Sequence, residues 1–145
     1  MDKRSFIRLS VAGSAAGIIL PRAVFAANLG PVLESKLAGG VFYTADEFGR
    51  WNEALAEHHL PRLETEKSGG KVRLQATTHH PMNAWEHYII KHQLLDAKLN
   101  FLQEHKYDPR QDKPQTVFEM GGYRGPVYVM TMCNVHDMWM NMIEV

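Results

Sequence analysis

The strongest chemical signal in the sequence is a cysteine and a histidine three positions apart, in the segment Cys133-Asn134-Val135-His136. The segment follows an apolar run directly, so a loop there could turn the thiolate and the imidazole onto one metal ion. Because the chain has a single cysteine, further soft donors must be imidazoles, and the candidates are His59, His80 and His87. A thiolate combined with imidazoles suits iron, copper or zinc, whereas calcium and magnesium prefer oxygen ligands.

The counts of the other ligand types narrow the chemistry further. One cysteine cannot form an internal disulfide, a CxxC redox pair or a four-cysteine metal site. All eight histidines lie beyond residue 57. An isolated histidine is usually exposed or hydrogen-bonded, and we predict that role for His92 and His105.

Length and composition indicate one small globular domain. The chain has 145 residues, of which 45% are hydrophobic and 22% charged, values that exclude disordered, collagen-like and coiled-coil proteins. Residues 1–26 hold four of the 16 basic and one of the 16 acidic residues, which leaves the remainder with 12 basic against 15 acidic ones. Because phosphate binding needs clustered Lys and Arg, we expect no nucleic-acid partner.

The first 26 residues have the features of a signal peptide. Residues 1–8 are basic, residues 9–20 form an apolar stretch too short to span a bilayer, and Val24-Phe25-Ala26 suits cleavage before Ala27. The segment from Lys3 to Arg8 resembles a twin-arginine motif with lysine as its first basic residue, which predicts a periplasmic protein exported in folded form. Ordinary Sec export and an uncleaved membrane anchor are the alternatives. After cleavage we expect no stable membrane span.

The elements that must position the candidate ligands are mostly short strands. Thr44-Ala45-Asp46-Glu47 has the form of a capping box and predicts a helix over about 45–56. Strands are predicted over 71–76, 85–95, 99–103, 116–120 and 126–132, separated by Gly and Pro turns. This pattern favours an antiparallel sandwich or barrel, although periodicity also allows an amphipathic helix over 85–95. We expect a linker-like lead over 27–44 and a single domain over 45–145.

Three motifs in one order resemble the superoxide reductase family, also known as neelaredoxin and as the iron domain of desulfoferrodoxin. The motifs are Glu57-His58-His59-Leu60-Pro61, then His80-Pro81-Met82 leading to Glu86-His87-Tyr88-Ile89, then Cys133-Asn134-Val135-His136 followed by Trp139. The resemblance spans residues 57–139. It implies an all-β, immunoglobulin-like antiparallel sandwich of about seven strands that holds one non-haem iron.

The resemblance also implies the ligands and the reaction. The iron would have four imidazoles in a plane, a thiolate on the axis and an open sixth position; the ligands are His59, His80, His87, His136 and Cys133. Ferrous iron in this family reduces superoxide to hydrogen peroxide by one electron, and an external donor, such as a cytochrome or a small redox protein, reduces the iron again. Relatives assemble through their β-sheets, so a homo-oligomer is expected.

Two positions depart from the family pattern. The family often has a lysine where this chain has His58, next to Glu57, and we expect both residues to line the open site. A protonated His58 could attract superoxide and donate a proton, whereas a neutral imidazole attracts an anion weakly. The spacing from His80 to His87 is seven residues, one more than the usual family spacing.

Adjacent histidines raise a choice of ligand in two of the motifs, at His58-His59 and at His79-His80. Neighbouring side chains of an extended chain point to opposite faces, so one histidine of each pair should reach the metal. The match to the family pattern favours His59 and His80.

A blue-copper electron carrier is the main alternative function. Cys133, His136 and Met140, with one upstream histidine, satisfy its ligand order, again on an exported β-sandwich. This hypothesis leaves the motif from Glu57 to Pro61 without a role. A non-catalytic metal-binding module is a third hypothesis. The alternating methionines between Met130 and Met142 are more typical of one packed strand face than of metal ligands.

Overall fold

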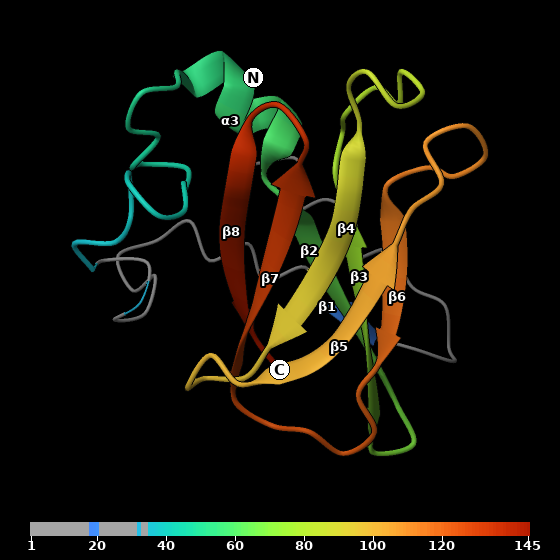
Figure 1. Ribbon diagram of the computed structural model, residues 1–145. Helices are drawn as coiled ribbons and strands as arrows, with labels where there is room; N and C mark the ends of the chain where they lie inside the picture. Colours follow the sequence, from blue (N-terminus) through green and yellow to red (C-terminus); the bar gives the residue numbers. More distant parts are fainter. Residues whose placement is uncertain (1–17, 21–31, 33–34) are drawn as a thin grey trace, which may run out of the picture.

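The computed structural model describes residues 18–20, 32 and 35–145, which form two antiparallel β-sheets facing each other and a short helix at one end (Figure 1). The first sheet has the order β1-β2-β3-β6 and contains β1 (Ile18–Leu20), β2 (Arg62–Ser68), β3 (Lys71–Thr77) and β6 (Gln115–Glu119). The second has the order β5-β4-β7-β8 and contains β4 (Ile89–Leu95), β5 (Phe101–Lys106), β7 (Pro126–Cys133) and β8 (Asp137–Glu144). The predicted all-β sandwich is confirmed, with seven strands from β2 to β8.

The strand β1 is a short addition to this sandwich. It pairs with β2 and lies inside the range predicted as a signal peptide. The rest of residues 1–26, and residues 27–31 and 33–34 of the predicted lead, lie outside the described residues.

Alternating side chains build the core between the two sheets. Along β3, Val72, Leu74 and Ala76 are buried, while Lys71 and Arg73 are exposed. A strand covers a core in this way because its side chains alternate between two faces. The facing sheet contributes alternate residues of β4, β7 and β8, and the buried members of the shared cluster are Leu63, Val72, Leu74, Ala76, Leu94, Phe118, Val127, Val129, Ile143 and Val145. Burying each Val or Leu side chain stabilises the fold by about 1.5–3 kcal/mol.

An irregularity in β4 changes which of its residues face the core. The register between β4 and β7 shifts between Ile89 and Lys91. As a result Ile89, which pairs with Cys133, is buried together with His92 and Leu94, although two residues separate Ile89 from His92. A bulge of this kind inserts one residue and re-aims the side chains that follow it.

The helix α3 (Glu53–His59) begins later than the sequence predicts. Thr44 Oγ1 does accept hydrogen bonds from the backbone amides of Asp46 and Glu47. These bonds close a local turn and do not begin a helix. Gly49 then adopts a positive φ of 50°, which interrupts any helix. The prediction of a helix over 45–56 is therefore wrong in its position, because the capping residues at 44–47 serve a local turn.

The observed cap of α3 lies eight residues further along the chain. Asn52 is extended, and its side-chain oxygen accepts from the Leu55 amide at 3.0 Å. The helix ends at His59, and the chain turns extended at Leu60, before Pro61. The short helix thus places His59 at its C-terminal end.

The segment before α3 packs along the edge strand β8. The Tyr43 amide donates to the Met138 carbonyl at 2.9 Å, and the Met140 amide donates to the Tyr43 carbonyl at 2.9 Å. Phe42, Tyr43 and Thr44 are all buried. The expected boundary between lead and domain, after residue 44, falls inside this packed segment.

Several strands differ from their predicted limits. The amphipathic-helix alternative for 85–95 is wrong, since residues 89–95 are a strand between β5 and β7. The strand predicted at 99–103 begins at Phe101, because Leu99 has a positive φ of 64° in the preceding turn. The strands β2 and β8 were not among the segments that the periodicity singled out.

Gly49 provides a test of how closely the segment before α3 packs against itself. A Cβ atom at Gly49 would lie 2.2 Å from the Gly39 carbonyl oxygen, whereas at Gly69, which also has a positive φ, it would meet no atom within 4 Å. We expect Gly49→Ala to lower the free energy of unfolding by about 3 kcal/mol, and Gly69→Ala by about 1 kcal/mol. Urea unfolding of both variants measures this, and equal losses would contradict the close approach.

Candidate metal centre

Five potential metal ligands converge at the end of the sandwich where α3, the β3–β4 loop and the β7–β8 turn meet (Figure 1). One ligand atom from each side chain lies within 4.8 Å of every other; the side chains are His59, His80, His87, Cys133 and His136. We call this group the ligand cluster. The structure therefore brings together all five residues that the sequence nominated as ligands.

Each ligand is fixed by the end of a regular element or by a tight turn. His59 is the last residue of α3 and Cys133 is the last residue of β7, while His136 lies in the turn to β8. His80 and His87 lie in the loop from β3 to β4. The donors thus come from three separate segments of the chain: the end of α3, the β3–β4 loop, and the end of β7 with the turn that follows it.

The longer spacing between His80 and His87 is accommodated by a turn. The amide of Asn83 donates to the carbonyl of His87 at 2.8 Å, and these two residues form an antiparallel bridge. Ala84, inside the turn, takes a positive φ of 43°. The loop therefore closes on itself, and His87 still reaches the cluster.

Asn134 ties this loop to the β7–β8 turn. Its side-chain oxygen accepts from the Tyr88 amide at 2.9 Å, and its amide group donates to the Glu86 carbonyl at 3.0 Å. The asparagine within the Cys-Asn-x-His motif therefore connects the segment that carries His87 to the segment that carries Cys133 and His136. Sequence reasoning gave Asn134 no role, since a side chain that bonds to backbone leaves no spacing signal.

The distances between donor atoms are those of neighbouring ligands. His87 Nε2 lies 3.0 Å from His80 Nε2 and 3.0 Å from His136 Nδ1. Cys133 Sγ lies 3.8 Å from His80 Nε2 and 3.7 Å from His136 Nδ1. Two nitrogens at right angles, each bound to a metal at about 2.1 Å, would be about 3.0 Å apart. The three histidine donors therefore have the separation that coordination of one ion requires.

Backbone carbonyls accept hydrogen bonds from the Nδ1 atoms of two of the imidazoles and so fix the orientation of the rings. His59 Nδ1 donates to the Leu55 carbonyl at 2.7 Å, and His80 Nδ1 donates to the Pro81 carbonyl at 2.5 Å. Each bond sets the tautomer in which Nε2 carries a lone pair, as is usual for a histidine that binds metal. His59 Nε2 is buried and has no hydrogen-bond partner in the described part of the chain. A buried acceptor without a partner is costly, and a metal ion at the cluster would satisfy it.

Burial favours the neutral form of these imidazoles. It lowers the pKa of His59 to about 3 and that of His80 to about 4, with further lowering from the neighbouring histidines. Burial also lowers the pKa of His136 and raises that of the Cys133 thiol. The imidazoles are thus ready to bind a cation without losing a proton, whereas the thiol has to release one.

An aromatic wall supports His136. The indole of Trp51 meets the His136 ring edge-on with centroids 5.0 Å apart, and Trp139 Nε1 donates to the His136 carbonyl at 2.8 Å. Tyr43 packs on Trp139, at a centroid distance of 5.3 Å. Sequence reasoning missed Tyr43, which lies within residues 27–44, the segment expected to be a linker-like lead.

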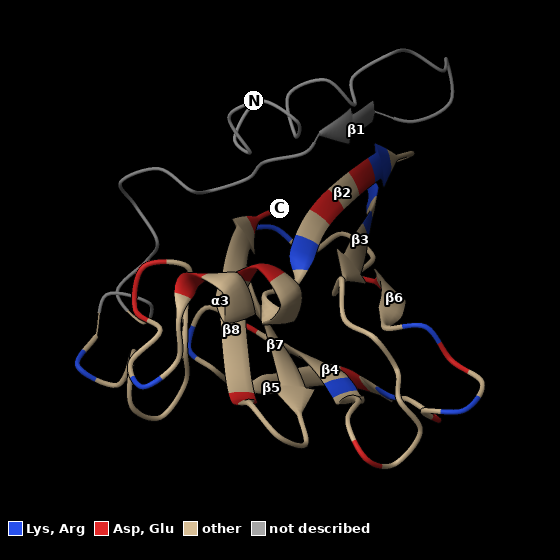
Figure 2. Cartoon of the chain, turned by 90° about the horizontal axis from the view of Figure 1, so that it is seen from above, with Lys and Arg blue, Asp and Glu red and all other residues tan. Residues whose placement is uncertain are grey.

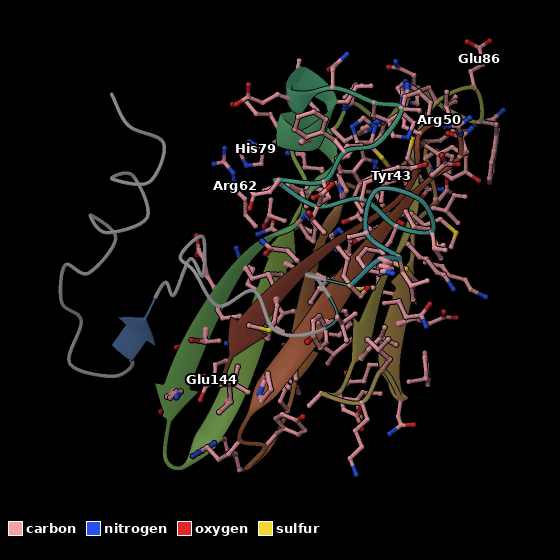
Figure 3. The ribbon with its side chains drawn as sticks, turned by 90° about the vertical axis from the view of Figure 1, so that its left-hand side faces the viewer. Tyr43, Arg50, Arg62, His79, Glu86 and Glu144 are labelled. Carbon is pink, nitrogen blue, oxygen red and sulfur yellow. The ribbon has the colours of Figure 1, made fainter. Side chains whose placement is uncertain are left out.

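An ion pair closes this wall on the solvent side. Arg50 Nη2 lies 2.6 Å from Asp137 Oδ2, and the guanidinium stacks over Trp51 at 4.5 Å. Figure 3 shows Tyr43 and Arg50 on the segment that crosses this end of the sandwich before α3. Figure 2, which looks onto the same end, shows acidic residues on α3 and at the start of β8. The Arg50 charge is therefore largely balanced by Asp137.

The remaining predicted site residues lie beside the cluster. Glu57 and His58 are exposed on α3, just before His59, and His58 Nδ1 lies 3.1 Å from the His79 carbonyl oxygen. His79 is exposed next to Arg62 (Figure 3). Of each adjacent histidine pair, one member therefore enters the cluster and the other points to solvent.

The remaining two histidines fulfil the role predicted for them. His105 is exposed on β5. His92 is fully buried on β4, and both of its ring nitrogens are hydrogen-bonded.

Comparison with known proteins places the chain in a family. A family model described as desulfoferrodoxin matches residues 51–142, and the chain belongs to the desulfoferrodoxin family. A superoxide reductase (neelaredoxin) from Ignicoccus hospitalis has a similar structure, with a TM-score of 0.61 and 21% identity over 74% of this chain and 95% of that one. No curated protein sequence matches the chain significantly.

Two further solved structures share the fold. A superoxide reductase from Nanoarchaeum equitans gives a TM-score of 0.54 and 16% identity, covering 66% of this chain and 96% of that one. A hypothetical protein from Pyrococcus horikoshii gives 0.52 and 25% identity, covering 61% and 89%. None of the helices among the residues described here has the length and apolar character needed to cross a membrane.

The lowered pKa values predict how the metal-free protein responds to acid. The ordinary pKa of 6.5 is lowered to about 3 in His59 and His92 and to about 4 in His80. Below about pH 6.5 the unfolded chain therefore binds more protons than the folded one, and acid favours unfolding. We expect the melting temperature of chelator-treated protein to fall steadily from about pH 7 to about pH 5. Calorimetry measures it, and a constant melting temperature over this range would contradict the neutral, buried imidazoles.

Proposed function

We propose that this protein is a one-iron superoxide reductase. Membership of the desulfoferrodoxin family and the fold shared with superoxide reductases support an oxidoreductase with a His/Cys metal site. The single observation that carries the proposal is the ligand cluster, in which four imidazoles and one thiol meet and His59 Nε2 has no hydrogen-bond partner among the described residues. Iron bound there would supply the redox chemistry, the one-electron reduction of superoxide that with two protons gives hydrogen peroxide, and an external donor would restore the ferrous state.

The donor set favours a metal that accepts both nitrogen and sulfur. Imidazole and thiolate ligands suit iron, whereas a magnesium or calcium ion would require oxygen ligands. Five protein donors leave a six-coordinate ion one position for a small anion. The Val135 amide donates to Cys133 Sγ at 3.4 Å, and this bond helps to stabilise the negative charge of a thiolate.

The protein environment of the cluster differs between its two sides. His59, His80 and Cys133 are buried, which keeps bulk water away from them. Glu57 and His58 stand exposed next to His59, and we propose that they border the approach of superoxide. When His58 Nδ1 donates to the His79 carbonyl, Nε2 is the ring nitrogen that carries the lone pair.

The blue-copper alternative receives less support from the strand faces. Cys133 packs with Ile89 and Tyr107, whereas Met140 packs with Phe42 and Tyr128 in a separate cluster. Met142 also belongs to that second cluster, and Met130 and Met138 border it, as expected for a packed strand face. A ligand set that combined Cys133 with Met140 would have to span the sheet.

The remaining parts of the proposal concern the cell. We propose that the signal peptide directs the chain to the periplasm, that a cytochrome or a small redox protein supplies electrons, and that the protein forms a homo-oligomer. The basic start and the short apolar stretch within residues 1–26 support the location, and the family resemblance supports the donor and the assembly.

Metal content is the first test of this function. Protein purified from its native compartment should contain one iron per chain by elemental analysis, since the ligand cluster provides one set of donors. One copper per chain would instead favour the electron carrier. Zinc, or no metal, would contradict the reductase and favour a binding module or a remodelled site.

Replacing the thiolate tests the reaction itself. We expect Cys133→Ser to lose about 100-fold or more of the peroxide produced from superoxide, because the soft ligand that tunes the metal is gone. Peroxide yield after a superoxide pulse measures this. Met132→Leu is the matched control, since Met132 neighbours Cys133 on β7 without belonging to the ligand cluster, and it should keep its activity. Full peroxide production by Cys133→Ser would sink the mechanism.

A further inference from the structure

A group of uncharged polar side chains lies buried between the sheets, next to the ligand cluster. We call it the buried hub; its members, each no more than 7% exposed, are Thr78, His92, Tyr107, Thr116 and Thr131. They come from β4, β6, β7, the β3–β4 loop and the segment that follows β5, so the hub connects both sheets. None of its side chains belongs to the ligand cluster.

His92 is the centre of the hub. Its Nε2 atom lies 2.8 Å from Thr78 Oγ1, and its Nδ1 atom lies 2.7 Å from the Tyr107 hydroxyl. Thr78 Oγ1 in turn contacts Thr131 Oγ1 at 3.0 Å, and the Tyr107 hydroxyl is hydrogen-bonded to Thr116. Four consecutive hydrogen bonds thus run from one threonine through the imidazole to another.

Proton counting shows that this chain of bonds is complete. A neutral imidazole has one donor and one acceptor, and each hydroxyl donates one proton. All four bonds form if every group donates in the direction from Thr116 to Thr131, or if every group donates in the reverse direction. Burial lowers the pKa of His92 to about 3, which keeps the imidazole neutral as this pattern requires. A buried network in which every group is satisfied restricts the packing around it to few arrangements.

The hub reaches the ligand His80 through Thr78. The carbonyl of Thr78 accepts from the His80 amide at 2.9 Å, and the Thr78 amide donates to the Pro114 carbonyl at 2.9 Å. Thr78 is therefore held through its hydroxyl as well as through both backbone groups. Its position determines where the chain that carries His80 leaves β3.

The hub reaches the ligand Cys133 through β7 and through Tyr107. Thr131 is two residues before Cys133, so both side chains lie on the inner face of β7. Tyr107 packs in one buried cluster with Cys133 and Ile89, and Ile89 is the β4 partner of Cys133. His92 pairs with Thr131 across the same two strands.

From this placement we infer that His92 is a positioning residue for the metal centre: through Thr78 and Thr131 it sets the place of His80 relative to Cys133, whose donor atoms lie 3.8 Å apart. Metal affinity and the strength of thiolate coordination should therefore depend on a side chain that does not touch the metal. The inference rests on the proposed metal site, but it does not require superoxide to be the substrate.

Cobalt(II) titration of the metal-free protein tests the inference. Co²⁺ bound by a thiolate gives a charge-transfer absorption band, which reports coordination by Cys133 apart from any enzymatic activity. We expect His92→Leu, which removes both hydrogen bonds, to weaken Co²⁺ binding about 10-fold or more and to reduce this band. The control is Gln93→Leu, because Gln93 follows His92 on β4 and its side chain therefore lies on the opposite face of the sheet. It should bind Co²⁺ like the parent protein.

A second variant keeps the test decisive if His92→Leu does not fold. Thr78→Val keeps the shape of the side chain but removes the hydroxyl that joins His92 to the loop of His80, and we expect the band to weaken in it as well. Circular dichroism identifies the folded variants. Unchanged affinity and band in any folded hub variant would overturn the inference and leave the hub as a purely structural network. A parent protein that binds Co²⁺ without a thiolate band would instead overturn the proposed metal site.

Discussion

Four imidazoles and one thiol lie within 4.8 Å of one another, and burial favours the neutral form of two of these imidazoles, His59 and His80. Protonated rings at this spacing would repel each other strongly, and burial adds to the cost of any charge. The carbonyls of Leu55 and Pro81 hold the imidazoles of His59 and His80 in one tautomer. Without a cation, His59 Nε2 is a buried nitrogen that has no hydrogen-bond partner in the part of the chain that the structure describes. The fold therefore stabilises an arrangement whose polar groups are completed by a positive ion.

The support for this arrangement comes from two unlike sources. On the inner side, the uncharged network around His92 fixes the strands under His80 and Cys133, and its bonds are shielded from water. On the outer side, the segment before α3 brings Tyr43 and Arg50 to the wall around His136. The Arg50–Asp137 pair is exposed and contributes little by itself, whereas burial of the Tyr43 ring contributes much more. The match to the family model starts at residue 51, so this outer support comes from residues that precede it.

The parts of the site that follow from residue type and order were predictable. The thiolate and the imidazoles stand in recognisable motifs. Side-chain alternation predicted that one histidine of each adjacent pair reaches the cluster, and the match to the family pattern selected His80 over His79. Position along the chain was harder to predict, because Thr44 has the signature of a helix cap but closes a turn, while the real cap at Asn52 lacks the full motif. The hub was invisible in the sequence, since a histidine and scattered threonines have no spacing pattern until the sheets bring them together. The predicted helix therefore begins too close to the N-terminus, and His92 was predicted only to be exposed or hydrogen-bonded.

The side chains of β7 and β8 alternate between the two faces of the sheet, and this alternation determines which sulfur atoms lie on the same face as the imidazoles. Val127, Val129 and Cys133 share the inner face of β7, and Met130 pairs with Met140 on the opposite face. A slip of one residue in this pairing would exchange the faces and bring methionine sulfur toward the imidazoles. Such a slip would be costly because it would break buried contacts on both faces. Tyr128 packs with Phe42 on one face, and the valines pack with the facing sheet on the other. Packing far from the ligand cluster thereby keeps the methionines of β7 and β8 away from it and leaves Cys133 as the sulfur donor from these two strands, which is the donor that the proposed iron chemistry needs.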